Sequence, residues 1–524
     1  MVLPFQSVNA MLEAKSNNAA LETSISADQP QDPSVSTRLD RQPRNVPYSV
    51  YTKAEKWTLV GMVAVAGLFS PLPANIYFPA IPTLAAVFDK SIEDINLTVT
   101  IYLAMQGCSP MLWGPLSDRY GRRPLFLICL LILVGSCVGL ALCPTSAFWL
   151  LLLLRAVQSG GCASMIALGA GLIGDIATGD ERGGFFGWFN LGPMLAPCIG
   201  PALGGVLSEH LGWRSIFWFL TIFSAACFAM ILFFLPETMR ALAGNGSLSP
   251  GGLLWRPLTP IIGRASSAQC TTQEEKPSSK PTSTNPFKLL IYPDIILTLT
   301  YTGIVYAVNY TITSTISSSY TATYPYLSET LIGICYLSTG VGMVLGSTIT
   351  GKLLDQDYAR IKRRHCGIAT SDTGDDSSSI EESKFPIEYA RLRMIPVLLV
   401  VFVASVVGWG WSIQAKANIS VPLVLQVILG YTSISILNAT MTLMIDLIKQ
   451  QSSGVIACTN LVRCSLAAIL VSLIDKATQA IGYGWTYTIL GGLCSLLLVC
   501  IYVEIRKGPK WRINRVKSHH TVGG

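Results

Sequence analysis

The sequence predicts an all-α polytopic membrane protein with twelve transmembrane helices in two six-helix pseudo-symmetric halves. The first observation is composition: of 524 residues, 51% are hydrophobic and only 13% are charged, whereas about a quarter of a soluble domain is charged. The second is the recurrence of apolar segments of about 20 residues, the length that crosses a bilayer as a helix. The third is a long polar stretch near the middle of the chain, as expected for a connector between two transporter halves.

The apolar segments and the polar stretches between them define the expected domain organisation. The six helices of the first half are expected at 57–78, 92–113, 124–143, 147–174, 182–207 and 215–235, and those of the second at 290–312, 329–350, 394–413, 421–445, 454–474 and 485–504. The first half (57–235) and the second half (290–505) are flanked by a disordered N-terminus at 1–56, a linker at 236–289 and a basic tail at 506–524. A further polar loop is expected at 354–392. These polar stretches lack the apolar content that a packed domain needs.

The basic residues fall mostly in segments on one side of the predicted membrane. Short basic loops stay in the cytoplasm, so both termini and the linker are expected there. The net charge of +7 follows from this asymmetry and does not indicate nucleic-acid binding. No cleavable signal peptide or organelle signal is recognisable, which favours a multi-pass protein of the plasma membrane.

A basic hairpin at Gly114–Arg123 sets the orientation of the other helices. It holds three arginines and one carboxylate, and Asp118 can accept hydrogen bonds from a helix start or pair with an arginine. The alternative is a charged turn that sets topology and does nothing more. A related pattern returns from Gly351 to Asp355 and Tyr358. Repetition at corresponding positions of two halves is typical of duplicated transporters.

Polar residues inside the first half point to a central cavity. Arg155 lies in a run of leucines, with Gln158 on the same helical face. A charge within the bilayer costs several kcal/mol unless it faces a cavity or a partner; the alternative is an arginine that reaches the interface. The proline-rich stretch 71–79 is irregular for a helix, which makes Asn75 and Tyr77 candidate cavity residues. Their alternative is a helix terminus in the outer interface.

The second half supplies the matching polar residues. The helix at 290–312 contains Tyr306 and Asn309, and later helices contain Asn438 and Arg463. With two arginines and no clear carboxylate at mid-membrane, the cavity should suit anionic or neutral molecules better than cations. The group that carries a proton is left unassigned; Asp118 and Asp175 are the available guesses.

The helix at 182–207 carries prolines and glycines at four-residue spacing. Pro193, Pro197 and Pro201 form one series, and Gly200 and Gly204 form another. Internal prolines bend a helix and glycines allow a neighbour to approach. The pattern favours a hinge or a tight interface, with a merely kinked packing helix as the alternative.

These motifs together resemble the major facilitator superfamily. Gly114–Arg123 is similar to its G-x-L-[AS]-D-R-x-G-R-[RK] loop between helices 2 and 3, and the resemblance implies a cytoplasmic gate. The implied gate residues are Gly114, Asp118, Arg119, Gly121, Arg122 and Arg123, with Asp355 in a degenerate second copy. Arg155 and Gln158 resemble the R-x-x-Q-G motif of helix 4, which is associated with proton coupling, although Ser159 replaces the usual glycine.

The resemblance also bears on the direction of transport. The helix 5 motif G-P-x-x-G-G of the superfamily's antiporters is similar to Gly200–Gly205, and it marks exporters; the implied residues are Pro197, Gly200, Pro201, Gly204 and Gly205. Ala196 stands where the family often has glycine. The run from Asp446 to Arg463 resembles fungal members of the twelve-helix drug:proton antiporter branch.

The expected function is therefore proton-coupled efflux of small organic molecules, such as a secondary metabolite, toxin or drug, by alternating access. An exporter of organic acids such as citrate is the alternative, and a non-transporting sensor is a third reading. No nucleophile–base or metal-ligand cluster is recognisable, so neither an enzyme nor a metal or other cofactor is expected. The expected partners are the cargo, protons and the lipid bilayer, with the chain acting as a monomer.

Overall fold

A computed structural model describes residues 48–246, 252, 254–259, 261–262, 291–369, 387–447 and 452–522. All regular elements within these ranges are helices. The expectations for 1–47, for most of the linker and for 370–386 lie outside the described residues.

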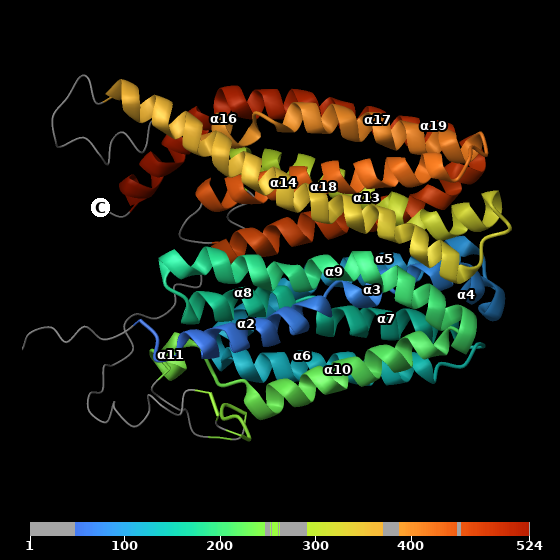
Figure 1. Cartoon of the computed structure of the whole chain (residues 1–524), viewed down its shortest axis with the longest axis horizontal. Helices are drawn as coiled ribbons and strands as arrows, with labels where there is room; N and C mark the ends of the chain where they lie inside the picture. Colours follow the sequence, from blue (N-terminus) through green and yellow to red (C-terminus); the bar gives the residue numbers. More distant parts are fainter. Residues whose placement is uncertain are drawn as a thin grey trace, which may run out of the picture. The chain divides into compact units, whose positions relative to one another are not determined.

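The helices follow the predicted order (Figure 1). The first group comprises α2 (Lys53–Leu68), α3 (Leu72–Asn75), η1 (Phe78–Ala80), α4 (Ile81–Phe88), α5 (Ile92–Tyr120), α6 (Arg122–Ala141), α7 (Phe148–Cys162), α8 (Met165–Ile176), α9 (Gly179–Leu211), α10 (Arg214–Phe234) and the short α11 (Arg240–Ala243). The second comprises α13 (Pro293–Thr323), α14 (Glu329–Ala369), α16 (Ile387–Leu392), α17 (Ile395–Gln414), α18 (Ser420–Leu447) and α19 (Ser452–Val522).

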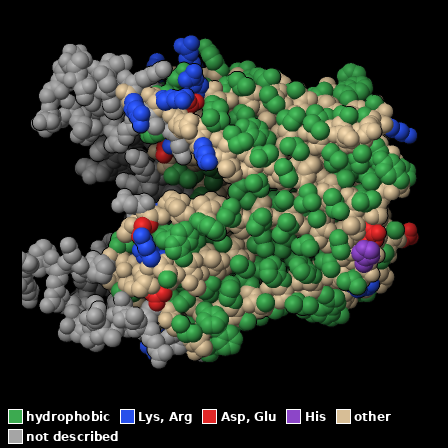
Figure 2. Space-filling view, in the orientation of Figure 1, with side chains coloured by type: hydrophobic (Ala, Val, Ile, Leu, Met, Phe, Trp, Pro, Cys, Tyr) green, Lys and Arg blue, Asp and Glu red, His purple; other side chains and the backbone are tan. Residues whose placement is uncertain are grey.

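The all-α membrane architecture is confirmed. Ten helical segments among the described residues are long and apolar enough to cross a membrane. One of them, Gly454–Arg512, contains two helices, because Gly482 breaks the helical backbone with φ 78. α5 is 29 residues long and is not among the ten. With α5 and the divided segment counted, the described helices account for each of the twelve predicted positions. Figure 2 shows the matching surface, with apolar side chains across the middle and charged ones toward the ends.

The first predicted helix is broken into four pieces and is longer than expected. Instead of one helix at 57–78, the chain forms α2, α3, η1 and α4 and ends at Phe88. Prolines occupy the first turns of α3, η1 and α4, where a missing N–H leaves no hydrogen bond unmade. The irregular backbone predicted at 71–79 lies within this stretch.

The basic hairpin is tighter than the sequence indicated. α5 continues to Tyr120 rather than ending at 113, so Gly114 is helical and only Gly121 turns the chain, with φ 104. In the second half, α14 continues to Ala369; the first part of the loop expected at 354–392 is therefore helix. Charged residues do not end a helix once it leaves the bilayer, which is why apolar length alone underestimated both helices.

Two helix pairs join the groups. α9 packs against α14 and α5 packs against α19. Glycines allow the close approach: a Cβ on Gly340 of α14 would lie 2.5 Å from Sγ of Cys198 on α9, and one on Gly107 of α5 would lie 3.2 Å from Cβ of Cys464 on α19. The blue-to-green and yellow-to-red helices of Figure 1 meet along these pairs.

Candidate functional site

Arg155 is fully buried in the first group of helices. Its Nη1 donates to the carbonyl oxygen of Pro73 at 3.1 Å and to Oε1 of Gln158 at 2.7 Å. Gln158 in turn donates from Nε2 to Sγ of Cys137 at 3.2 Å. The broken backbone after α2 therefore supplies a carbonyl that a regular helix would have used internally. The alternative interpretation required the arginine side chain to reach the membrane interface, whereas Arg155 is fully buried.

Two tyrosine rings enclose the guanidinium of Arg155. Its Cζ lies 4.2 Å from the ring centroid of Tyr77 and 4.5 Å from that of Tyr102. Both rings are fully buried, and such desolvated cation–π contacts contribute about 2 kcal/mol. Tyr77 is a predicted cavity residue that the structure brings to Arg155. Tyr102 was missed, because a lone tyrosine in α5 carries no sequence signal.

Arg463 repeats this arrangement in the second group. Its Nη2 donates to Oδ1 of Asn460 at 3.2 Å, and Asn460 donates from Nδ2 to the backbone oxygen of Gln106 on α5 at 3.1 Å. Its Cζ lies 4.4 Å from the ring centroid of Tyr306. Both arginines thus combine an amide three residues away with an aromatic ring. The second set also ties α19 to α5.

An aromatic row runs from Arg463 toward the first group. Tyr306 lies 5.7 Å from Tyr310, and Tyr310 lies 5.7 Å from Phe78, measured between ring centroids. Phe78 also stacks on Tyr336 of α14 at 6.2 Å. These rings come from η1, α13 and α14, so both groups contribute to one aromatic surface next to the two arginines.

The remaining predicted cavity residues, three asparagines, lie in different surroundings and do not all join the arginines. Asn75 is buried, and its Nδ2 donates to the carbonyl oxygen of Pro71 at 2.7 Å, so it stabilises the broken helix. Asn309 is buried in α13, one residue before Tyr310. Asn438 donates to Oγ of Ser347 at 3.2 Å and therefore binds α18 to α14 instead of joining the arginines.

Positive charge dominates this region. In the described part of the chain, neither Arg155 nor Arg463 forms an ion pair, and Nε and Nη2 of Arg155 and Nε of Arg463 have no hydrogen-bond acceptor. A buried cation without an ion-pair partner is costly, and guanidinium donors are well suited to bind an anion.

The basic hairpin forms its own charge cluster at one end of the molecule. Arg122 pairs with Asp118 at 2.8 Å and with Asp175 at 3.2 Å. Arg119 is exposed and stacks on Tyr120 with Cζ 5.5 Å from the ring centroid. Asp118 thus pairs with an arginine, one of the two interactions expected for it. The side chain of Asp355 lies outside the described residues.

The side chain of Glu237 binds the backbone of the hairpin, a role that the sequence did not indicate. Its Oε1 accepts from the backbone N–H of Arg122 at 2.9 Å and its Oε2 from that of Arg123 at 3.1 Å. Arg123 is fully buried and donates to the carbonyl oxygens of Leu232 and Leu254. The carboxylate caps the start of α6, where the helix dipole favours a negative charge.

Among the residues that the structure describes, most of the polar bonds between the two groups lie at the end opposite the hairpin. These join Asn96 to Asp475 (2.5 Å), Glu93 to Lys476 (2.9 Å), Glu209 to the backbone N–H of Thr330 (2.8 Å) and Thr83 to Glu329. The surface is hollowed between the two groups at the basic end (Figure 2).

The residues of α9 that resemble an exporter motif lie where this helix packs against its neighbours. A Cβ on Gly204 would overlap the backbone oxygen of Ile76, and one on Gly205 would overlap that of Glu329. A Cβ on Gly200 would lie 3.2 Å from Cβ of Asn75, and a Cβ on Gly333 would lie 2.5 Å from the backbone oxygen of Pro201. Pro197 is half-buried in the same helix. The motif therefore packs α9 against both the end of α3 and the start of α14.

The fold and the polar interior define a polytopic membrane transporter. A model of the Major Facilitator Superfamily matches residues 63–472. This chain belongs to the Major Facilitator Superfamily.

Its relatives are fungal exporters and drug transporters. It is 33% identical to Citrate exporter 1 of Aspergillus niger over 92% of this chain and 91% of that protein. It is 34% identical to Multidrug transporter AQR1 of Candida glabrata over 94% of this chain and 83% of that protein. It is 32% identical to MFS-type transporter phiD of a fungal species, over 90% and 71% of the two chains. The predicted resemblance to fungal drug antiporters is confirmed.

Proposed function

We propose that this transporter exports small organic molecules in exchange for protons, and that carboxylate-bearing molecules are the cargo class its interior suits best. The observation that carries this proposal is the pair of arginines without carboxylate partners. A bound organic anion would accept from the unused donors of Arg155 and Arg463 and offset the desolvation of their charges. The similarity to a protein named Citrate exporter 1 supports the same cargo class.

Export of varied drugs or toxins is the second candidate. The aromatic row of Phe78, Tyr306, Tyr310 and Tyr336 offers apolar contact without fixed geometry, as sites for drug-sized ligands do. The similarity to a protein named Multidrug transporter AQR1 supports this reading. The two candidates differ in what they require of the arginines, since only an anion needs both charges.

The proposed cycle uses residues 57–235 and 290–505 as two rocking bodies. In this proposal the end opposite the hairpin is the outer end; its polar bonds and the hollow at the basic end support assigning this structure to a cytoplasm-open state. The hairpin residues Gly114–Arg123 and Asp355 are proposed to close that end in the opposite state. The glycine contacts of α9 with the end of α3 and with α14 support a role as the sliding interface.

Protons are proposed to bind at Asp118 or Asp175. Both carboxylates form ion pairs with Arg122, so protonation of either would weaken its attraction for that guanidinium and loosen the hairpin.

The proposed location is the plasma membrane, with both termini in the cytoplasm, because the basic segments gather at the hairpin end. A monomer without enzymatic activity is proposed, since the proposed cargo and proton sites all lie within one chain.

The test is efflux from proteoliposomes under an imposed pH gradient. Labelled citrate, a neutral hydrophobic compound and a lipophilic cation would be compared for the native chain, Arg155→Ala and Arg506→Ala. Arg506 is an exposed arginine of α19, so it controls for the loss of one charge. We expect gradient-driven citrate movement that is lost in Arg155→Ala alone. Preferred movement of the lipophilic cation would contradict the anion proposal, and movement of several unrelated compounds would establish the second candidate.

A further inference from the structure

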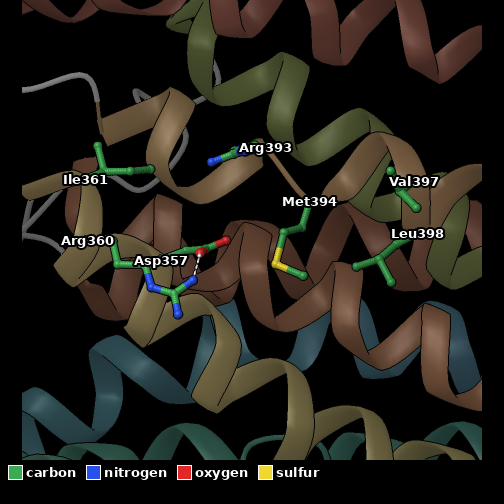
Figure 3. Close-up of a pocket in the computed structure, with 7 residues that line it drawn as sticks. All are labelled: Asp357, Arg360, Ile361, Arg393, Met394, Val397 and Leu398. Carbon is green, nitrogen blue, oxygen red and sulfur yellow. Dashed lines mark ion pairs between the residues drawn. The ribbon is translucent and has the colours of Figure 1, made fainter. Parts of the chain in front are cut away.

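A pocket lies on the outer surface of the second group, away from the arginines between the halves. Its volume is about 490 Å³. Figure 3 shows its lining, which comprises Asp357, Arg360, Ile361, Arg393, Met394, Val397 and Leu398. All of these come from the end of α14 and from the junction of α16 with α17. The pocket therefore cannot be the passage between the two groups.

Positively charged side chains stand at the mouth of this pocket. Arg360 is 71% exposed and forms a long ion pair with Asp357, at 3.7 Å. Arg393 is exposed on the facing segment. In the sequence, Lys362, Arg363 and Arg364 follow Arg360 after the single residue Ile361. A basic cluster next to the cytoplasmic end of a membrane helix attracts anionic lipid headgroups, at about 1 kcal/mol for each basic residue.

The rest of the lining is apolar and continues along α17. Met394 and Leu398 are half-buried in the pocket wall. Val397 is 69% exposed and Val400 and Val401 are 55% and 40% exposed. These valines extend into the span of α17, where they face the lipid phase. A ligand that fills the pocket thus meets cations at one end and an apolar track at the other.

We propose that this pocket binds an anionic phospholipid of the cytoplasmic leaflet. The phosphate group lies between Arg360 and Arg393, and one acyl chain follows Val397 and Val401. Asp357 can accept a hydrogen bond from a headgroup ammonium or hydroxyl group. A soluble phosphate would use the two arginines but leave the apolar wall exposed. The assignment of the leaflet rests on the orientation given under the proposed function.

Lipid retention by the purified full-length chain tests this proposal. The protein would be equilibrated with mixed micelles that contain phosphatidylserine, phosphatidylinositol or phosphatidylcholine, and bound lipid would be counted by native mass spectrometry. We expect selective retention of the two anionic lipids and about 30-fold weaker retention in Arg360→Gln/Arg393→Gln. The matched control, Arg506→Gln/Lys507→Gln, removes two exposed charges from α19 and should retain lipid normally.

A second variant separates a lipid from a soluble anion. Val397→Asn/Val401→Asn changes only exposed side chains, so folding should be preserved and acyl-chain binding weakened. Equal retention of phosphatidylcholine, equal loss in the α19 control, or displacement of the lipid by inorganic phosphate alone would overturn the proposal. Because binding is measured without transport, the result does not depend on whether the cargo proposal holds.

Discussion

Arg155 illustrates how a charge can be kept inside a membrane without a carboxylate. A proline-broken backbone offers a carbonyl oxygen, a neighbouring amide offers a second acceptor, and two tyrosine faces cover the remaining surface. Each of these partners is neutral, so the positive charge is stabilised but not cancelled. The residue remains an electrostatic attractor for an anion, which a salt-bridged arginine would not be.

The geometry of Arg155 predicts that lysine cannot replace it. A lysine has the same charge but no planar fork that can bond Pro73 and Gln158 while lying between two rings. We expect Arg155→Lys to lower the initial rate of pH-driven citrate efflux at least about tenfold, with the protein still folded. Arg214→Lys is the control, because Arg214 also stacks on a ring, that of Trp213, but is exposed. Normal transport by Arg155→Lys would show that charge alone suffices.

The Glu237 carboxylate predicts a stability effect at the hairpin. It accepts from the N–H groups of Arg122, Arg123, Thr238 and Met239. In Glu237→Gln one acceptor becomes a donor that faces N–H groups, which costs about 1–3 kcal/mol for each bond left unmade. The melting temperature in detergent should fall by several degrees. Glu93→Gln, which weakens an ion pair with the exposed Lys476, should change it little.

At the scale of a helix, α9 shows that glycine positions on one helix are not equivalent. A Cβ on Gly192 would overlap the backbone oxygen of Ala64 in α2, whereas a Cβ on Gly187 would meet nothing within 4 Å. We therefore expect Gly192→Ala to destabilise the protein by about 1–3 kcal/mol and Gly187→Ala to be neutral or slightly stabilising. Thermal unfolding of the two variants, with fluorescence detection, measures the difference. Equal melting temperatures would show that α2 and α9 do not pack this closely.

The positions of the helices could be predicted because a bilayer imposes a minimum length on each span. The ends of the helices and the breaks within them could not be predicted in this way. The apolar runs located every span, but α5 extends through the hairpin to Tyr120 and α14 extends to Ala369, because backbone hydrogen bonds continue where hydropathy stops. The site was predictable only in part. Arg155 and Gln158 share a helical face by spacing, but Tyr102 and Glu237 reach their partners through tertiary packing. Asn438, predicted to face the cavity, bonds Ser347; spacing alone does not distinguish these roles, since a polar residue in a membrane can also face a neighbouring helix.

For the whole molecule, the polar bonds at the end opposite the hairpin, the outer end of the proposed orientation, are expected to influence which state of the proposed cycle is populated. Asn96 of α5 and Asp475 of α19 are both buried, and their hydrogen bond of 2.5 Å joins the two groups of helices. The sequence does not indicate this hydrogen bond, because it forms only when two helices far apart in the chain pack together. Removing such a bond costs about 1–3 kcal/mol, which corresponds to a shift of about 5- to 150-fold in a two-state equilibrium.

Asp475→Ala should therefore favour the outward-open state. Ser317 is fully buried and donates to the carbonyl oxygen of Pro79 across the two groups, so a cysteine there reports opening of the outer end. We expect a membrane-impermeant maleimide, added from the side opposite the termini, to label Ser317→Cys at least about fivefold faster when Asp475→Ala is also present. Labelling of the native cysteines is measured in the same variants without Ser317→Cys and subtracted. Lys476→Gln, at the exposed neighbouring residue, should leave the rate nearly unchanged. Equal labelling in all three backgrounds would mean that the glycine contacts of α9 with α14, and not the polar bonds, keep the outer end closed.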